Sequence, residues 1–190
     1  QIASATYVGG GILFLSPIAS CPAGEVAVGG GVDVSNPYFL VASGSAPTFG
    51  GFSFYSRPDG PGEAPDGWSA PSNLSQPAAV TAKAGVLCAA GVDVAIQIAS
   101  ATMPVGETRT ATATCPVGKV ALSGGVRAGS AALTIFDLQP TFASGSLATF
   151  PPGEAPAPIG WTVTARNDDV FERILKVAAL CIPAGDATVT

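Results

Sequence analysis

Short apolar segments alternate with segments rich in Gly, Pro and Ser along the whole chain. Residues that favour strands gather in several of the apolar segments. In residues 105–112 the polar side chains alternate, as expected for a strand with one face in water. Turn residues follow at short intervals, which is typical of an all-β protein. The clearest predicted strands are Thr108–Thr114, Leu133–Leu138, Gly160–Arg166, Phe52–Tyr55 and Ala79–Leu87.

An internal repeat divides the chain into two halves. The opening hexapeptide Gln1–Thr6 returns unchanged as Gln97–Thr102. The offset between the halves drifts only in segments rich in Gly, Pro and Ser, where loops tolerate insertion. Further features recur in the same order, beginning at Cys21 and Cys115 (Cys-Pro-x-Gly), Gly30 and Gly124 (Gly-Gly-Val), Pro47 and Pro140 (Pro-Thr-Phe), Pro61 and Pro152 (Pro-Gly-Glu-Ala-Pro), Gly67 and Gly160 (Gly-Trp), and Leu87 and Leu180 (Leu-Cys).

The segment Asp168–Leu180 is ambiguous by itself, because its apolar residues fall at helical spacing behind an Asp that could cap a helix. Its counterpart in the first half, Ser75–Leu87, contains Pro77 and Gly85 and reads as a strand. Equivalent positions in a duplication should fold alike, so we predict a strand in both halves.

These patterns predict two tandem, homologous, β-sandwich-like domains, residues 1–96 and 97–190, each about the size of a small β-sandwich. The duplication favours one disulfide inside each domain, Cys21–Cys88 and Cys115–Cys181, over the two other ways of pairing four cysteines. Four reduced cysteines in a cytosolic protein are the alternative. Disulfides would indicate an exported protein. The first residue, Gln1, fits either a removed secretory signal or a shortened chain.

Composition argues against several classes of function. The chain has no His, so neither a Ser-His-Asp triad nor a His-metal site can be built. Only 8 basic residues stand against 13 acidic ones, which disfavours binding to nucleic acid. No run of apolar residues is long enough for a membrane span. We therefore expect neither an enzyme nor a cofactor.

Several residues that resemble functional sites are better explained by structural roles. The glycines around Gly30 and Gly124 lack the Lys of a phosphate-binding loop and predict a bulge or a close strand crossing. Trp68 and Trp161 are expected in the cores. The paired carboxylates Glu63 and Glu154 would lie in separate domains, which disfavours paired-acid catalysis. The acids that are candidates for binding Ca²⁺ lack a spaced ligand loop, and exposed turn carboxylates are the alternative interpretation. Those acids are Asp33, Asp93, Asp168 and Asp169.

The two halves differ most near their first strands. Residues 11–18 of the first half form a continuous apolar run that needs cover on both faces, or a partner, whereas the matching residues of the second half are polar. The chain passes from the first half to the second without a flexible linker. What the first half presents to the second, the second could present to another molecule, and a head-to-tail contact of that kind builds fibres. Strand 1–16 would then complete a neighbouring sheet. The residues predicted for this interface are Ile2, Tyr7, Ile12, Leu13, Phe14 and Leu15.

The frame of Cys-Pro-x-Gly, Gly-Gly, Gly-Trp and a strand that ends in Cys resembles a repeat found in exported bacterial proteins of uncharacterised role. It covers residues 21–88 and 115–181. The resemblance implies an extracellular β-domain and no particular activity.

The expected function is that of an extracellular structural protein that assembles with copies of itself into a filament, fibre or surface layer. The alternative is a secreted module that binds a carbohydrate or another ligand, with Tyr38, Phe52 and Tyr55 as the aromatic platform. Asn73-Leu74-Ser75 is a glycosylation sequon and makes a glycan a further candidate partner in a eukaryotic secretory route.

Overall fold

The computed structural model of the chain describes residues 1–7, 14–35, 40–42, 44–74, 80–130, 132–144 and 156–186. In these residues the regular elements are strands, apart from two short 3-10 turns, η1 (Phe54–Ser56) and η3 (Ala184–Asp186). None of the described helical turns is long and apolar enough to cross a membrane. The prediction of an all-β fold is confirmed.

The second repeat shows the architecture most plainly. Strands β12-β17-β14 lie against the three-stranded sheet β13-β16-β15, and all neighbouring strands are antiparallel. A core of mostly small apolar residues, including Ala111, Val163 and Val177, fills the space between them. The strands are β12 (Ala95–Met103), β13 (Thr108–Thr114), β14 (Lys119–Ala128), β15 (Leu133–Thr141), β16 (Gly160–Asn167) and β17 (Arg173–Pro183).

The first repeat has the same order with shorter pieces. Its sheet β1-β11-β4 corresponds to β12-β17-β14, and its second sheet is divided into β2-β10-β5 and β3-β9-β6. The predicted strand Phe52–Tyr55 is shorter than expected, because Phe54 and Tyr55 belong to η1. The strands are β1 (Ile2–Tyr7), β2 (Phe14–Leu15), β3 (Ile18–Ser20), β4 (Glu25–Val34), β5 (Leu40–Ala42), β6 (Gly44–Phe49), β7 (Phe52–Ser53), β8 (Gly60–Gly62), β9 (Gly67–Ser69), β10 (Ser72–Leu74) and β11 (Val80–Ala90).

The register of the strands repeats with the sequence. Cys88 lies opposite Ala27, and Cys181 lies opposite Ala121. Directly after these alanines the register shifts by one residue, so β4 and β14 carry the same bulge at equivalent positions. The disulfides Cys21–Cys88 and Cys115–Cys181 both form, each with its Cα atoms 5.7 Å apart. Both predicted pairings are therefore confirmed, and each closes one repeat.

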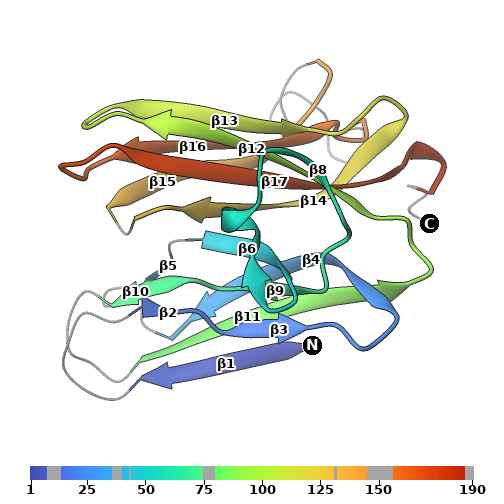
Figure 1. Cartoon of the computed structure of the whole chain (residues 1–190), viewed down its shortest axis with the longest axis horizontal. Coiled ribbons are helices and arrows are strands. Elements are labelled where there is room, and N and C mark those ends of the chain that lie inside the picture. The colour runs from blue at the N-terminus through green and yellow to red at the C-terminus, as the bar shows by residue number, and fades with distance from the viewer. Residues whose placement is uncertain are drawn as a thin grey trace.

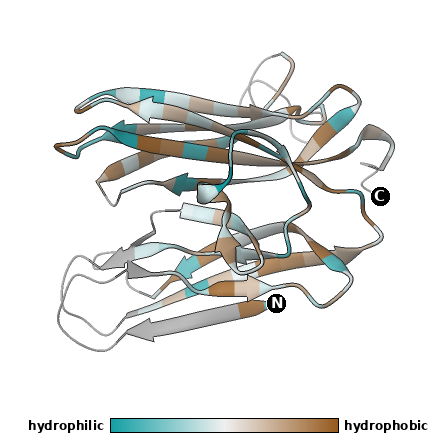
Figure 2. Cartoon of the chain, viewed as in Figure 1, coloured by the Kyte–Doolittle hydropathy of each residue, from teal (hydrophilic) through white to brown (hydrophobic). Residues whose placement is uncertain are grey.

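Strand β17 explains why its sequence looked helical. Val177 and Ala179 face the core of the second repeat, whereas Ala178 and Leu180 face the core of the first. A strand with apolar cover on both faces has no reason to alternate polar and apolar residues. The hydrophobic segments along the strands that border this first core are visible in Figure 2.

The recurring Gly-Gly and Gly-Trp pairs meet in space. A Cβ on Gly30 would lie inside the contact distance of the Trp68 indole, and a Cβ on Gly124 would do the same to Trp161. Because these glycines have no side chain, each indole can pack directly against the strand that carries the glycine. Trp68 is fully buried and Trp161 packs against the second core, so the predicted core role of both residues is confirmed.

We predict that Gly30→Ala and Gly124→Ala each destabilise the protein by about 1–3 kcal/mol, because the new methyl group would force the indole to move. Denaturant unfolding of the oxidised protein measures this free energy. Gly31→Ala is the matched control, since nothing lies within 4 Å of a Cβ on Gly31. Equal effects of Gly30→Ala and Gly31→Ala would contradict the assigned role of Gly30.

Candidate functional site

The two repeats share one sheet. Strand β6 of the first repeat pairs with β14 of the second, with Ser45 opposite Val126 and Gly44 opposite Arg127. The strands β3-β9-β6 thereby continue into β14-β17-β12. Figure 1 shows the second repeat above the first, with β6 between them. The contact between the repeats is therefore partly backbone pairing at strand edges.

The outer face of β14-β17-β12 closes the core of the first repeat. Ile96, Ile98 and Leu180 from this face belong to the same buried cluster as Phe54 and Trp68 of the first repeat. Each of these five side chains is at most 5% exposed. Neither repeat could lose the other without opening this core to water.

A segment of the first repeat, residues 52–62, extends along the second repeat and is called the strap (Figure 1). Its strand β8 pairs with the outer edge of β12. Lys176 of β17 donates a hydrogen bond from Nζ to the carbonyl oxygen of Arg57 at 2.6 Å, and its Nζ lies 3.5 Å from Oδ1 of Asp59. Oδ2 of Asp59 accepts hydrogen bonds from the backbone N–H and the hydroxyl of Ser100, at 3.0 and 2.6 Å. These polar contacts position the strap over the apolar contact.

One glycine of the second repeat is required by this contact. A Cβ on Gly125 would lie 2.7 Å from the carbonyl oxygen of Ser45 and 2.7 Å from Cδ of Pro47. The backbone of the first repeat therefore approaches β14 at a point where only a glycine leaves room.

The corresponding face of the first repeat is uncovered in the described part of the chain. It is the face of β1-β11-β4 that points away from the first core, and we call it the open face. Its Ile2 and Leu87 are 79% and 68% exposed, whereas their counterparts Ile98 and Leu180 are 5% and 0% exposed. The residues that define the open face are Ile2, Gly31, Asp33, Lys83, Gly85 and Leu87.

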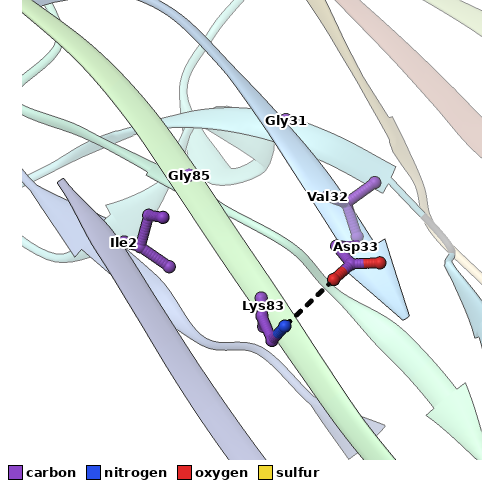
Figure 3. Close-up of a pocket in the computed structure, with 6 residues that line it drawn as sticks. All are labelled: Ile2, Gly31, Val32, Asp33, Lys83 and Gly85. Atoms are coloured by element: carbon purple, nitrogen blue, oxygen red, sulfur yellow. Dashed lines mark hydrogen bonds and ion pairs between the residues drawn. The ribbon is translucent and has the colours of Figure 1, made fainter. Parts of the chain in front are cut away.

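A shallow depression of about 280 Å³ lies on the open face, and Figure 3 shows the side chains around it. Nζ of Lys83 lies 3.2 Å from Oδ2 of Asp33 at its rim. Both side chains are largely exposed, at 49% and 68%. Gly85 and Gly31 are direct partners on β11 and β4, and their missing side chains make the depression. A partner for this face would meet an apolar hollow with one ion pair beside it.

The predicted assembly residues lie mainly in the strands of the first repeat. Ile2 belongs to the open face. Tyr7 ends β1 opposite Val80, and the backbones of Phe14 and Leu15 form β2 and pair with β10. Ile12 and Leu13 lie outside the described residues. Strand β1 therefore pairs along its whole length with β11 of its own repeat.

The predicted aromatic platform is not brought together in the described residues. Tyr38 lies outside them. Phe52 is 75% exposed. Tyr55 is partly buried, and its hydroxyl occupies the space beside Gly129 of the second repeat, while Nζ of Lys176 lies 5.9 Å from the centre of its ring. Tyr55 therefore contributes to the contact between the repeats.

Each acid considered for Ca²⁺ is paired with a base. The pairs are Asp33 with Lys83, Asp93 with Lys119, Asp168 with Arg166, and Asp169 with Arg173. The described residues contain no group of three or more His, Cys, Asp or Glu that could share a metal ion. Glu63 pairs with Arg57 at 3.3 Å, and Glu154 lies outside the described residues. Asn73 of the sequon lies on β10, and Ser75 is outside the described residues.

The strap, Lys83 and the two glycines of the open face are not among the site residues predicted from the sequence. The signal was available in the repeat itself, because Lys83 aligns with Lys176, and Gly31 with Gly125. It was not recognised because nothing in the sequence marks which face of a sheet receives the neighbouring repeat.

Comparison with protein families, with curated proteins and with solved structures found no match to this chain.

The turn between β16 and β17 makes stability depend on pH. Hydrogen bonds from Arg173 and Ser130 lower the pKa of Asp169 from 3.8 to about 2. A carboxyl with a lower pKa in the folded state contributes stability above its unfolded pKa and loses it as the pH falls through the folded pKa. We predict that Asp169→Asn flattens the loss of stability between about pH 4 and pH 2. Denaturant midpoints across this window test it, with Glu172→Gln, which changes an exposed carboxylate between β16 and β17, as the control. Parallel curves for Asp169→Asn and the unchanged protein would contradict the prediction.

Proposed function

We propose that this chain is an extracellular structural protein that assembles head to tail with copies of itself. One observation carries the proposal. The first repeat covers the outer sheet face of the second repeat, and the equivalent face of the first repeat, the open face, is uncovered and apolar at Ile2 and Leu87. Inside the chain the equivalent face is covered by the first repeat, and the second repeat of another molecule offers the surface most similar to that cover.

An extracellular setting is supported by the two disulfides. They join cysteines 67 and 66 residues apart, and in the chain-entropy model a loop of that length stabilises a fold by about 4 kcal/mol. Disulfides of this structural kind persist in oxidising compartments.

The geometry of the contact favours a polymer over a closed dimer. The two surfaces in the contact are different. One is the β6 side of the first repeat, and the other is the outer face of β14-β17-β12 in the second repeat. A contact between two different surfaces leaves one of each free after every addition, so it continues into a fibre unless the rotation closes a ring.

The driving force is burial of apolar surface. Covering a side chain such as Ile2 or Leu87 contributes roughly 1.5–3 kcal/mol. Among its described residues the open face carries one ion pair, Lys83–Asp33, so few charges there lose their water on association.

Exchange of the N-terminal strand is not part of this proposal. Strand β1 occupies the place in its own sheet that β12 occupies in the second repeat, with six register pairs to β11. Assembly through the open face leaves β1 where it is.

A carbohydrate platform is less well supported. It would need Tyr55, whose hydroxyl and ring are already in contact with Gly129 and Lys176 of the second repeat.

We predict concentration-dependent assembly of the oxidised chain, visible as fast-sedimenting material by analytical ultracentrifugation and as fibres by negative-stain microscopy. Leu87→Ser should weaken the association at least 10-fold, because the lost burial exceeds about 1.4 kcal/mol. Val117→Ser is the matched control, since Val117 is also an exposed apolar residue but lies in the turn before β14, outside the open face. A chain that stays monomeric at every concentration would overturn the proposed function.

A further inference from the structure

Two adjacent glycines on β4 have different physical explanations. Gly30 makes room for the indole of Trp68. Gly31 is exposed, and nothing in the described chain lies within 4 Å of a Cβ placed on it. A glycine inside a strand weakens the strand and often marks a bulge, a tight bend or the close approach of another group. Nothing within the described repeat requires Gly31.

The counterpart of Gly31 shows what a glycine at this position admits. Gly125 is approached by the carbonyl oxygen of Ser45 and by the ring of Pro47, both from the edge strand of the preceding repeat. The two glycines also lie in the same rows across their sheets. The rows are Ile2-Gly85-Gly31 in the first repeat and Ile98-Ala178-Gly125 in the second.

The second repeat carries a strand equivalent to β6. Pro140 lies opposite Trp161 on β15 and β16, as Pro47 lies opposite Trp68 on β6 and β9. Within the described chain, β15 is an edge strand, and so is β4. Pro140 is partly exposed, whereas Pro47 is buried against the second repeat. Both strands needed for a second contact of this kind, β15 and β4, are therefore present, and each lies at the edge of its sheet.

We propose that β15 of one molecule pairs with the free edge of β4 of another, with Pro140 over Gly31 and Leu138 opposite Val32. This inference rests on the proposed function and specifies its contact. The partner is a second copy of this chain because the equivalent strand, β6, already pairs with the equivalent edge strand, β14, inside the chain.

The charges differ at one end of this contact. Inside the chain Gly44 lies opposite Arg127, and a Cβ on Gly44 would lie 2.5 Å from the carbonyl oxygen of Val126. Asp137 takes the place of Gly44 in the second repeat, and Asp33 takes the place of Arg127 in the first. Two like charges and a steric conflict therefore meet at this position, so the pairing between molecules ends at Leu138. The contact is correspondingly weaker than the one inside the chain.

Two substitutions with opposite expected effects test the contact by sedimentation of the full oxidised chain. Gly31→Val should leave the thermal midpoint unchanged or raised, because the space is empty and Val favours strands, but should weaken association at least 10-fold. Asp137→Gly restores the residue of the internal contact and should strengthen association at least several-fold.

A cross-linking experiment locates the contact directly. Asp33→Cys chains mixed with Asp137→Cys chains should be joined between molecules by a short bismaleimide, whereas Asp33→Cys mixed with Thr114→Cys should not. Thr114 is an exposed residue of β13 and lies outside both edges.

The outcomes separate the two proposals. If the unchanged chain assembles, but Gly31→Val does not weaken assembly or the Asp33 and Asp137 cysteines are not joined, the β4–β15 contact is wrong while head-to-tail assembly stands. If the unchanged chain stays monomeric, the proposed function is overturned, and if Asp137→Gly stays monomeric as well, the β4–β15 contact is overturned with it.

Discussion

Burial of β17 on both faces is the constraint on which the arrangement of this protein depends. One face of the strand fills the core of the second repeat, and the other completes the core of the first through Ala178, Leu180 and Ile182. A face of that kind cannot stay in water without a large loss of hydrophobic free energy. The first repeat must therefore lie against it, and the pairing of β6 with β14 and the position of the strap follow from that packing.

The recurring motif is a device for folding one repeat. The cysteines close each repeat, and the glycine before each Gly-Val makes room for a tryptophan on the facing sheet. The cysteines and the Gly-Trp pairs thus hold each repeat together. Gly44 and Arg127, which lie opposite one another where the first repeat meets the second, are replaced in the other half by Asp137 and Asp33. The absence of His and the small number of charged residues are consistent with a chain whose recurring Cys, Gly and Trp residues serve packing.

The open face connects this packing to the proposed function. It repeats the framework of a surface that is known, from inside the same chain, to accept a repeat: the row with Ile2, the lysine at position 83 and the glycine at position 31. In the described chain it has no such cover, and it carries Gly85 and Asp33 where the second repeat has Ala178 and Arg127. Its hollow arises from two facing glycines, and a hollow of backbone suits an approaching strand better than it suits a small polar ligand, because few groups point into it.

The sequence by itself determined the duplication, the all-β fold and both disulfide pairings, because these depend on local strand preference and on features that recur in order along the chain. Comparison of the halves also predicted strands rather than helices in Ser75–Leu87 and Asp168–Leu180, and the described strands there begin at Val80 and Arg173. Only the tertiary structure decided that Tyr55 contacts the second repeat, that Gly125 is required by Ser45 and Pro47, and that Gly31 is not required by anything described. The physical reason is that cover on a sheet face comes from residues far away in the sequence, and two aligned glycines read alike until their neighbours in space are known.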